Sequence, residues 1–475
     1  MTDSNSYDAV IVGAGPNGLA AAITLIRQGL SVVVCEAKET TGGGTRTAQL
    51  TLPGFHHDIC SAVHPLALVS PFFRSVDLSE YGLAWIHSPA SLAHPLDDGT
   101  AVVLERSAEL SAQRLNSDAE RYYAVIQPLI RNWEALAEDI LQPLSIPDHP
   151  LILLQFAMLG LRSAEKFSLK RFRGEKTRAL FAGLAAHSIL PLNSMATTSF
   201  GLLLATAAHT VGWPIAGGGS QSIADALERH FMSLGGVVKT NHCVNSIHDL
   251  PEARAVLFDL IPRQIADIVG DRFPQNYTSR LRNHRHGPGV FKMDWALDGA
   301  IPWKAADCLS AATVHLGGSL EEIAASEMAA WQGQHVERPF VILAQPSLFD
   351  NTRAPEGKHT VWAYCHVPNG STFDMTDRVE SQIERFAPGF RERILARSVM
   401  LPIDMQTYNP NYQGGDIAGG AQFFTQLFFK PLGRWHAYST PVKGIYICSS
   451  SMPPGAGVHG MCGYNAANVA LNELY

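Results

Sequence analysis

Features that would assign a function directly are scarce in this sequence of 475 residues. Charged residues make up only 17% and the net charge is −7, so no basic face for nucleic acid or anionic lipid is indicated. The seven cysteines form no C-x-x-C pair, and the nineteen histidines show no metal-ligand spacing. These absences argue against a nucleic-acid-binding protein, a dithiol reductase and a metalloprotein.

Long apolar runs and a signal peptide are also missing. The longest apolar run, PLILLQFAMLGL at residues 150–161, is too short to cross a bilayer. We expect a buried helix there, with a membrane-surface helix through which lipid enters as the alternative. The first residues, MTDSNSYDAV, lack a basic stretch followed by an apolar one. We therefore expect a cytoplasmic protein, with peripheral membrane contact left open.

What the chain does contain is length and glycine turns. A chain of 475 residues predicts two joined domains, because a single compact core rarely grows so large. Near its start, an apolar run at 9–12 precedes the turn GAGPNG at 13–18, then a helical stretch and a second apolar run that ends at Glu36. This order of strand, G-x-G-x-x-G turn, helix, strand and terminal acid predicts a dinucleotide-binding unit.

Each residue of this turn has a mechanical role in holding a dinucleotide. Gly13 permits the tight turn, Gly15 lets the backbone approach a pyrophosphate, and Gly18 lets the helix lie close to the sheet. The helix begins at Pro16 and Asn17, and its free N–H groups face the phosphates. Glu36, at the end of the second strand, can accept hydrogen bonds from an adenosine ribose.

A second glycine cluster separates FAD from NAD, which the first turn alone does not. Residues 37–47 read AKETTGGGTRT and continue past the acid into a flexible loop. Through Gly43, Gly44 and Thr45 such a loop can wrap a long, extended dinucleotide. Arg46 is then available to pair with a phosphate.

This loop resembles a segment of the flavin-binding amine oxidase and phytoene desaturase superfamily, whose members carry G-G-R-x-x-[ST] here. Gly44 stands where that pattern has arginine, and Thr47 matches its final position, so Arg46 is expected to substitute for the arginine. The resemblance is closest to the phytoene-desaturase-like branch, which includes the pyridine nucleotide-disulfide oxidoreductase domain-containing proteins. It spans nearly the whole chain and implies FAD as the cofactor.

The same resemblance gives a role to residues 213–247. They read as a glycine turn, an amphipathic helix and a strand, which alone would be an ordinary α/β unit. In the superfamily this unit returns to the nucleotide domain. The resemblance implies that the backbone around Val244 lies against adenine.

The stretch at residues 444–470 completes the set with a strand, a glycine-rich turn and an alanine-rich helix. The resemblance implies that Gly455, Gly457 and Val458 lie beside the isoalloxazine, where negative charge collects on reduction. Both ends of the chain are thus predicted to bind one FAD. No second G-x-G-x-x-G occurs between residues 48 and 430, so electrons are expected to pass to oxygen, a quinone or a protein carrier rather than to a nicotinamide domain.

The predicted fold class is α/β. A discontinuous, Rossmann-like FAD-binding domain is interleaved with a substrate domain built on an antiparallel sheet plus helices. The boundaries that we predict are 1–70, 205–260 and 430–475 for the FAD-binding domain, and 71–204 and 261–429 for the substrate domain. Residues 71–205 read as mostly helical, and alternating apolar runs from 288 to 367 predict the antiparallel sheet.

One predicted strand, HTVWAYCHV at residues 359–367, has two different faces. Its small apolar residues are expected to pack on helices. Trp362, Tyr364 and His366 share the other face, which suits a cavity wall over a flavin. Trp362 and Tyr364 are therefore substrate-contact candidates.

Catalytic candidates are weaker than the cofactor motifs. His366, His64 and His459 could act as acid or base, but each could equally be a hydrogen-bonded structural histidine. Arg353 could orient an anionic end of the substrate, or it could join the two domains as a structural arginine.

The leading functional prediction is an FAD-dependent dehydrogenase that takes hydride from a hydrophobic organic molecule to flavin N5. The resemblance to phytoene desaturases implies desaturation of a carbon–carbon bond, without fixing a carotenoid substrate. Two alternative enzyme activities are a redox-neutral flavin-dependent isomerase and an amine oxidase. The non-enzymatic alternative is a scaffold protein that binds FAD.

Overall fold

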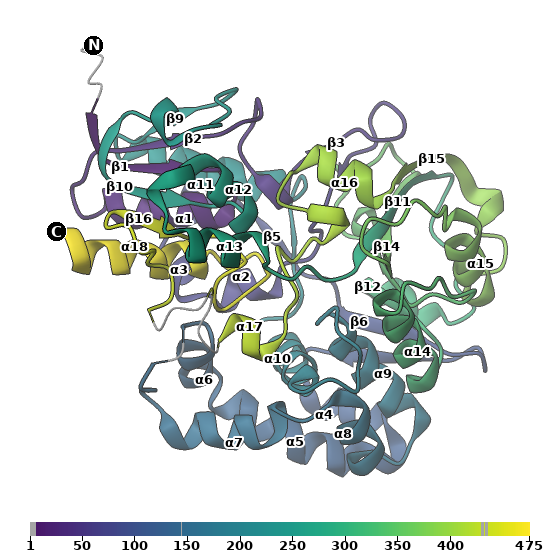
Figure 1. The fold of residues 1–475 in the computed structure, drawn as a ribbon. Helices are drawn as coiled ribbons and strands as arrows, with labels where there is room; N and C mark the ends of the chain where they lie inside the picture. Colours follow the sequence, from purple (N-terminus) through teal and green to yellow (C-terminus); the bar gives the residue numbers. More distant parts are fainter. Residues whose placement is uncertain (1–5, 144, 429–431, 433–435) are drawn as a thin grey trace.

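The computed structural model describes residues 6–143, 145–428, 432 and 436–475. Two large sheets organise these residues, one parallel and one mostly antiparallel, with helices packed around both (Figure 1).

The parallel sheet is assembled from distant parts of the chain. Its strands are β1 (Ser6–Val12), β2 (Val32–Cys35), β9 (Val237–Lys239), β10 (Glu252–Phe258) and β16 (Ile445–Ile447). They lie in the order β16-β10-β1-β2-β9, and every neighbouring pair is parallel. β2 and residues 9–12 of β1 are continuous apolar runs that are buried, as a sheet covered on both faces requires.

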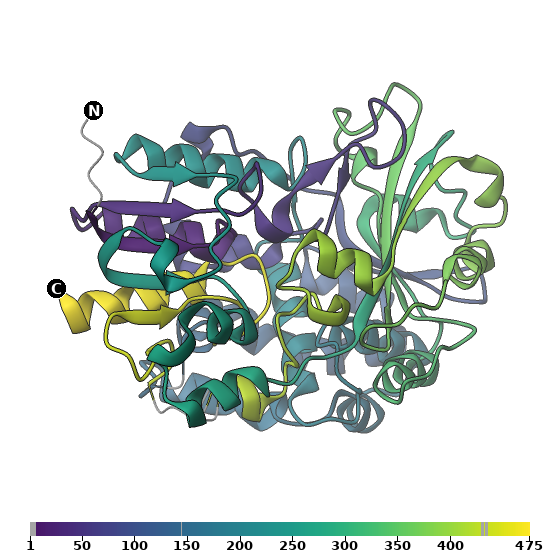
Figure 2. The same ribbon diagram turned by 45° about the horizontal axis from the view of Figure 1, so that its top comes forward.

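Three helices pack with this sheet, namely α1 (Pro16–Ile26), α11 (Gln221–Ser233) and α18 (Met461–Leu474). α1 and α18 lie side by side in two views, purple beside yellow (Figures 1 and 2). Their contact depends on a glycine, because a Cβ at Gly463 would lie 1.8 Å from the backbone oxygen of Asn17. The segment near the C-terminal end of the sequence therefore packs directly on the helix of the first glycine turn.

The second sheet has seven strands. They are β6 (Ala90–Pro95), β7 (Ala101–Glu105), β11 (Gly289–Leu297), β12 (Ala311–Leu316), β13 (Val341–Ala344), β14 (His359–Val367) and β15 (Ile394–Met400). Their order is β15-β11-β14-β13-β12-β6-β7, and all pairs are antiparallel except β12 with β6. Residues 71–205 are mostly helical, as predicted, but the prediction did not include β6 and β7. β6 pairs with β12, more than 200 residues later in the sequence, and β7 pairs with β6.

The two faces of this sheet differ as the alternation in β14 predicts. Val361, Ala363 and Cys365 belong to a buried apolar cluster with Val379 and Ile383 of α15 (Thr376–Phe386). The opposite face carries the polar and aromatic side chains of β14. This face is turned toward a large cavity that Trp362 and Tyr364 line.

The remaining helices lie around both sheets, and those of residues 108–210 fill the lower part of Figure 1. They are α2 (Pro65–Val69), α3 (Pro71–Arg74), α4 (Ala108–Arg114), α5 (Ala119–Arg131), α6 (Trp133–Ile140), α7 (Pro150–Gly160), α8 (Ala164–Arg171), α9 (Glu175–Ala186), α10 (Thr197–Thr210), α12 (Pro262–Val269), α13 (Gln275–Arg282), α14 (Leu320–Trp331), α16 (Pro402–Tyr408) and α17 (Phe424–Leu427). Two short strand pairs complete the fold, β3 (Thr47–Ala48) with β4 (His57–Asp58) and β5 (Trp85–Ile86) with β8 (Ile215–Ala216).

This architecture confirms the predicted fold class. The parallel sheet draws its strands from residues 6–35, 237–258 and 445–447, and the second sheet lies between them in sequence. The domain boundaries stay a prediction, and the one at residue 430 lies outside the described residues. Among the described helices, none combines the length and the apolar composition needed to span a bilayer.

Candidate active site

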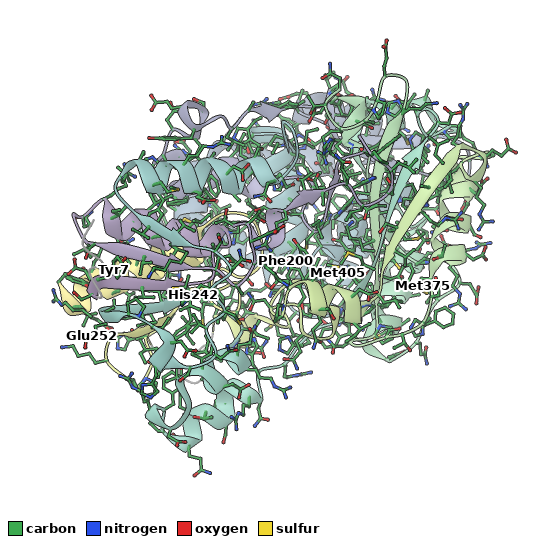
Figure 3. The ribbon with its side chains drawn as sticks, turned by 90° about the horizontal axis from the view of Figure 1, so that it is seen from above. Tyr7, Phe200, His242, Glu252, Met375 and Met405 are labelled. Carbon is green, nitrogen blue, oxygen red and sulfur yellow. The ribbon has the colours of Figure 1, made fainter. Side chains whose placement is uncertain are left out.

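One cavity of about 690 Å³ is lined by residues of both sheets. In Figure 3 the lining residue Phe200 of α10 is near the middle of the molecule. It lies between the parallel sheet, marked by Tyr7 and Glu252, and the side that carries Met375. The two predicted halves of an active site, a nucleotide motif and an aromatic sheet face, therefore open onto a common space.

The first two glycine clusters are in contact with each other at this cavity. The Gly42 N–H donates to the Ala14 carbonyl at 2.9 Å. A Cβ at Gly43 would lie 3.1 Å from the Cα of Gly15, so a larger residue there would press on the first turn. Gly13 has φ +101°, a backbone conformation that favours glycine. The loop at 37–47 thus packs on the G-x-G-x-x-G turn, as its predicted role requires.

Glu36 follows the last residue of β2, and its carboxylate is held from three directions. It accepts hydrogen bonds from the N–H groups of Ala14 at 2.8 Å and Lys38 at 3.0 Å, and it pairs with Arg46 at 3.2 Å. Arg46 also donates to the Thr40 carbonyl. The arginine predicted to be available for phosphate is therefore engaged with the carboxylate, although it still lines the cavity.

Asp259 is a second buried acid at the cavity, and the sequence reading missed it. It follows β10 as Glu36 follows β2, and its carboxylate accepts the Gly18 N–H at the start of α1 at 3.0 Å. Burial, together with the nearby Glu36, raises the pKa of Asp259 to about 7, although the Gly18 and Gly15 N–H groups act in the opposite direction. The signal that could have identified Asp259 in the sequence is its position directly after the apolar end of β10, which matches the position of Glu36 after β2.

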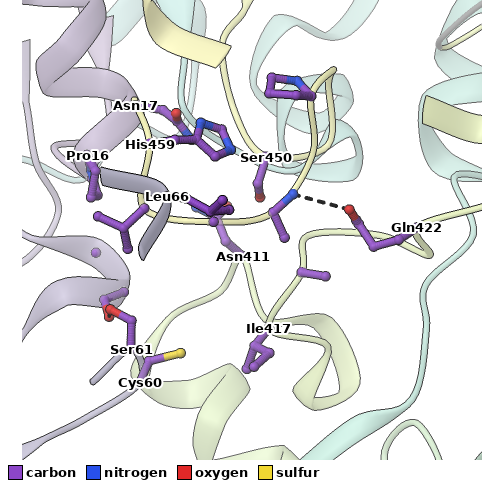
Figure 4. Close-up of a pocket in the computed structure, with 18 of the residues that line it drawn as sticks. Pro16, Asn17, Cys60, Ser61, Leu66, Asn411, Ile417, Gln422, Ser450 and His459 are labelled. Atoms are coloured by element: carbon purple, nitrogen blue, oxygen red, sulfur yellow. Dashed lines mark hydrogen bonds between the residues drawn. The ribbon is translucent and has the colours of Figure 1, made fainter. Parts of the chain in front are cut away.

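The turn near residue 457 also reaches this cavity. Pro454 and residues 456–459 line it, and Gly457 has φ +141°. The Ala456 N–H donates to the side-chain oxygen of Gln422 at 3.2 Å, the contact drawn as a dashed line in Figure 4. The same close-up shows Pro16 and Asn17 of α1 near His459, so the two ends of the sequence meet at one space.

Most of the predicted cofactor residues line the cavity. Those that do are Gly13, Gly15, Pro16, Asn17, Glu36, Gly43, Gly44, Thr45, Arg46, Val244, Gly457 and Val458. Gly18 and Gly455 do not line it. Gly18 packs against the Gly13 carbonyl, and the Gly455 carbonyl oxygen lies 3.1 Å from His459 Nε2, at hydrogen-bond distance. Their positions fit a role in shaping the two turns.

Two of the three candidate histidines line the cavity, and hydrogen bonds hold both rings. His64 Nε2 lies 2.9 Å from the Ser220 hydroxyl. His459 Nδ1 accepts the Met461 N–H at 3.0 Å, while its Nε2 bonds the Gly455 carbonyl. Burial lowers the pKa of each to about 4, so both are neutral at neutral pH. These contacts are those of structural histidines.

His366 requires a correction, because it lies on the expected face of β14 but does not line the cavity. Its ring bonds the buried Glu327 carboxylate of α14 at 2.8 Å, and that helix covers this end of the strand. Arg353 also lies away from the cavity. It is fully buried and pairs with Asp58 at 2.8 Å, which agrees with the structural alternative.

The substrate-contact candidates Trp362 and Tyr364 do line the cavity. Beyond them, the cavity wall contains many apolar residues that sequence patterns alone did not single out. These include Leu153, Phe156, Ala157 and Leu161 at α7, Phe200, Leu203 and Leu204 of α10, and Trp213 and Ile342. The apolar run at 150–161 predicts a helix. Which side of that helix faces the cavity follows only from its packing in the fold.

The buried acid Asp259 gives a testable pH dependence. Its folded-state pKa of about 7 lies above the ordinary 3.8, so the folded protein keeps this proton at pH values where the unfolded chain has released it. Stability is therefore lost as pH rises from about 4 to about 7. Asp259→Asn cannot ionise, so it should melt at a higher temperature than the unchanged protein at about pH 8, with the gain disappearing toward about pH 4.

Thermal unfolding across this pH range measures the effect, and Asp271→Asn at an exposed position serves as the matched control. A gain that does not depend on pH would contradict the assignment to Asp259.

Comparisons with known proteins agree with this geometry. A profile described as the NAD(P)-binding Rossmann-like domain matches residues 11–74. Pyridine nucleotide-disulfide oxidoreductase domain-containing protein 2 of Mus musculus is 26% identical over 98% of this chain and 94% of its own length. The lycopene-forming phytoene desaturase of Pantoea ananas is 23% identical over 97% of this chain and 98% of its own length.

Solved structures show the same fold. An oxidoreductase from Methanosarcina mazei superposes with a TM-score of 0.66 at 15% identity, covering 98% of this chain and 99% of its own. A variant of putrescine oxidase gives a TM-score of 0.62 at 19% identity, with 98% of each chain covered. The predicted resemblance to the phytoene-desaturase-like branch of the flavin-containing amine oxidase superfamily is confirmed, together with the predicted fold class.

Proposed function

We propose that this relative of the phytoene desaturases is an FAD-dependent oxidoreductase that dehydrogenates a hydrophobic organic molecule at a carbon–carbon bond. The observation that carries the proposal is one continuous cavity, which has three glycine turns on one side and apolar side chains on the other. A hydride donor and its acceptor must meet in such a space with water excluded.

The residues present fit FAD. The turns at Gly15, Gly43 and Gly457 line the cavity with backbone, and a Cβ at any of the three would press on a neighbouring protein atom and displace the turn. Asn17 has a buried side-chain oxygen without a partner among the described residues, and it lines the cavity. Such an atom is costly unless a ligand or water binds it. The donors and acceptors of a dinucleotide supply this kind of partner.

The sites of contact follow from the positions of these residues. Glu36 would bind the ribose, the N-terminal turn of α1 would bind the pyrophosphate, and Val244 would lie at the adenine. Gly457 and Val458 would lie at the isoalloxazine. When bound, the flavin supplies a two-electron acceptor for hydride. Its electrons are proposed to leave to oxygen, a quinone or a protein carrier.

The contribution of the chain itself is to bind and orient an apolar molecule. Phe156, Phe200 and Leu203 leave little polar surface in the outer part of the cavity, and apolar contact also excludes water from the reacting bond. The amine oxidase alternative has less support. Trp362 and Tyr364 meet edge to face, with centroids 5.1 Å apart and planes at 86°, rather than as two facing rings around an amine.

The central test uses the purified protein. It should be yellow, acid precipitation should release FAD, and anaerobic mixing with a panel of apolar substrates should decrease the visible flavin absorbance. NADH and NADPH should reduce it poorly, because no further G-x-G-x-x-G unit for a nicotinamide domain occurs between residues 48 and 430. A colourless protein that cannot be reconstituted with FAD would contradict the proposal, and reconstitution without any reducing substrate would favour the scaffold alternative.

α7 supports a finer proposal, that the protein takes its substrate from a membrane surface. Leu153 and Phe156 of this helix line the cavity, whereas Leu151 and Leu154 are 73% and 56% exposed. One helix therefore separates the apolar cavity from an apolar outer surface. The next helix, α8, has three exposed basic residues, Lys166, Lys170 and Arg171. This helix is therefore locally basic although the net charge of the whole chain is negative. An exposed apolar face followed by basic residues suits an anionic bilayer surface.

Replacing two exposed leucines, Leu151→Ser with Leu154→Ser, should weaken binding to anionic lipid vesicles at least about tenfold, because each leucine contributes about 1.5–3 kcal/mol when fully buried. Sedimentation with vesicles measures the bound fraction. Leu395→Ser with Ile403→Ser removes two comparably exposed apolar side chains elsewhere and should leave binding unchanged. An equal loss in both pairs of substitutions would contradict a specific role for α7.

A further inference from the structure

The sheet wall of the cavity contains polar groups without partners. Trp362 and Thr313 line the cavity and are 7% and 2% exposed, and the Trp362 Nε1 and Thr313 Oγ1 atoms have no hydrogen-bond partner among the described residues. Tyr364 is 9% exposed, and its hydroxyl is bonded to none of the described residues. A polar atom buried without a partner costs free energy in the unliganded protein, so a ligand is the natural partner.

Strand pairing places these groups close together on one face. Thr313 of β12 pairs with Ala344 of β13, which pairs with Trp362 of β14. Tyr364 lies two residues further along β14, on the same face. Its ring centroid is 5.1 Å from that of Trp362. Only the small side chain of Ala344 stands between Thr313 and Trp362 in this row.

A histidine pair extends this row of polar groups. His315 of β12 lies two residues beyond Thr313, and its Nε2 is 2.9 Å from the Nε2 of His187, which lines the cavity. A glycine of α9 makes room for it, because a Cβ at Gly183 would lie 2.7 Å from the His315 ring. Burial lowers the pKa of His187 to about 3 and holds the pKa of His315 well below its usual value, so this pair carries no charge at neutral pH.

We propose that this wall, formed by Trp362, Tyr364, Thr313 and His187, binds a carbonyl oxygen of an otherwise apolar substrate. The inference rests on the proposed function and specifies its substrate class. The indole N–H can only donate, and burial raises the pKa of Tyr364, so its hydroxyl stays protonated and can donate as well. The oxygen accepts from Trp362 and Tyr364, while Thr313 and His187 continue the polar strip toward β12.

Other ligand chemistries fit this wall less well. A hydrocarbon leaves the donors unpaired, and a protonated amine brings further donors to them. A carboxylate would need a cation, but the basic lysine and arginine side chains among the described lining residues are Lys38 and Arg46, both on the nucleotide side. A neutral carbonyl satisfies the donors without bringing charge into the cavity.

The test compares ligands that differ only by the oxygen. Isothermal titration of the FAD-loaded protein would use two ketone–hydrocarbon pairs of shared skeleton, nootkatone with valencene and carvone with limonene. Because net hydrogen bonds contribute about 1 kcal/mol or more each, the ketone of at least one pair should bind about tenfold more tightly than its hydrocarbon.

Variants then assign the preference to the wall. Tyr364→Phe and Trp362→Phe each remove a donor while keeping an aromatic ring, so each should reduce the ketone preference at least about threefold and leave hydrocarbon affinity nearly unchanged. Ile342→Val removes a methylene-sized part of the same wall and should weaken ketone and hydrocarbon equally. Melting temperatures near that of the unchanged protein show that the variants are folded.

Equal affinity within both pairs, no detectable binding of either ketone, or a preference that survives both donor removals overturns the inference. These outcomes are separate from a failure of the proposed function. A protein that shows the ketone preference but never transfers electrons from a substrate to its flavin keeps the carbonyl site and loses the dehydrogenase activity.

Discussion

Arg353→Met is expected to lower the free energy of unfolding by about 3–5 kcal/mol, because it leaves a buried carboxylate without its cation. The side chains of Arg353 and Asp58 are each 1% exposed, and their charged atoms lie 2.8 Å apart. Burial opposes the charge on Asp58, but Arg353 and the Ser220 N–H outweigh it and hold the Asp58 pKa below its usual value. Urea denaturation measures the loss.

The double variant Arg353→Met with Asp58→Asn is the control, since it removes both charges and should recover a large part of the lost stability. The folded Arg353→Met protein should keep its FAD content, because Arg353 does not line the cavity. A stable Arg353→Met protein that binds anionic substrates poorly would instead support a role in orienting the substrate.

Gly457→Val is expected to remove most of the bound FAD while the protein stays folded. The φ of +141° at this position is unfavourable for valine. A Cβ there would lie 2.7 Å from the Leu66 side chain and 3.0 Å from the His459 ring. Relief requires the turn to move, and that turn lines the cavity. The ratio of visible flavin absorbance to protein absorbance measures the loss, with far-UV circular dichroism as the test of folding.

Gly333→Val is a matched control for backbone strain. Gly333 also has a positive φ, +76°, but a Cβ there would meet no atom within 4 Å. This variant should lose some stability and keep its FAD. If Gly457→Val retains FAD as well as Gly333→Val does, the turn at 455–458 does not contact the cofactor.

The cofactor side of the site could be predicted because its signals are local. Gly13, Gly15, Glu36 and Gly43 lie in one continuous stretch of the sequence, in a recognised order of strand, turn, helix and strand. Asp259 could not be recognised in this way. It reaches the Gly18 N–H only because β10 pairs beside β1, across 241 residues of sequence.

The sheet wall shows a different limit. Alternation in β14 correctly predicted which residues share a face, and Trp362 and Tyr364 line the cavity as expected. The same alternation could not show that α14 covers the end of the strand and supplies Glu327 as the partner of His366. β6 and β7 were missed for a related reason, because β6 depends on pairing with the distant β12.

The order in which the parallel sheet is completed has a consequence for biosynthesis. β1, β2 and the first two glycine clusters are made early, but β16 and the turn at 454–459 are made only after the whole seven-stranded sheet. Until then the nascent chain carries an unfinished nucleotide cavity and the exposed apolar face of α1 on which α18 later packs. Tight cofactor capture therefore has to wait until β16 and the turn at 454–459 have been made, and the unfinished cavity and the uncovered face of α1 are sites of aggregation risk during the interval.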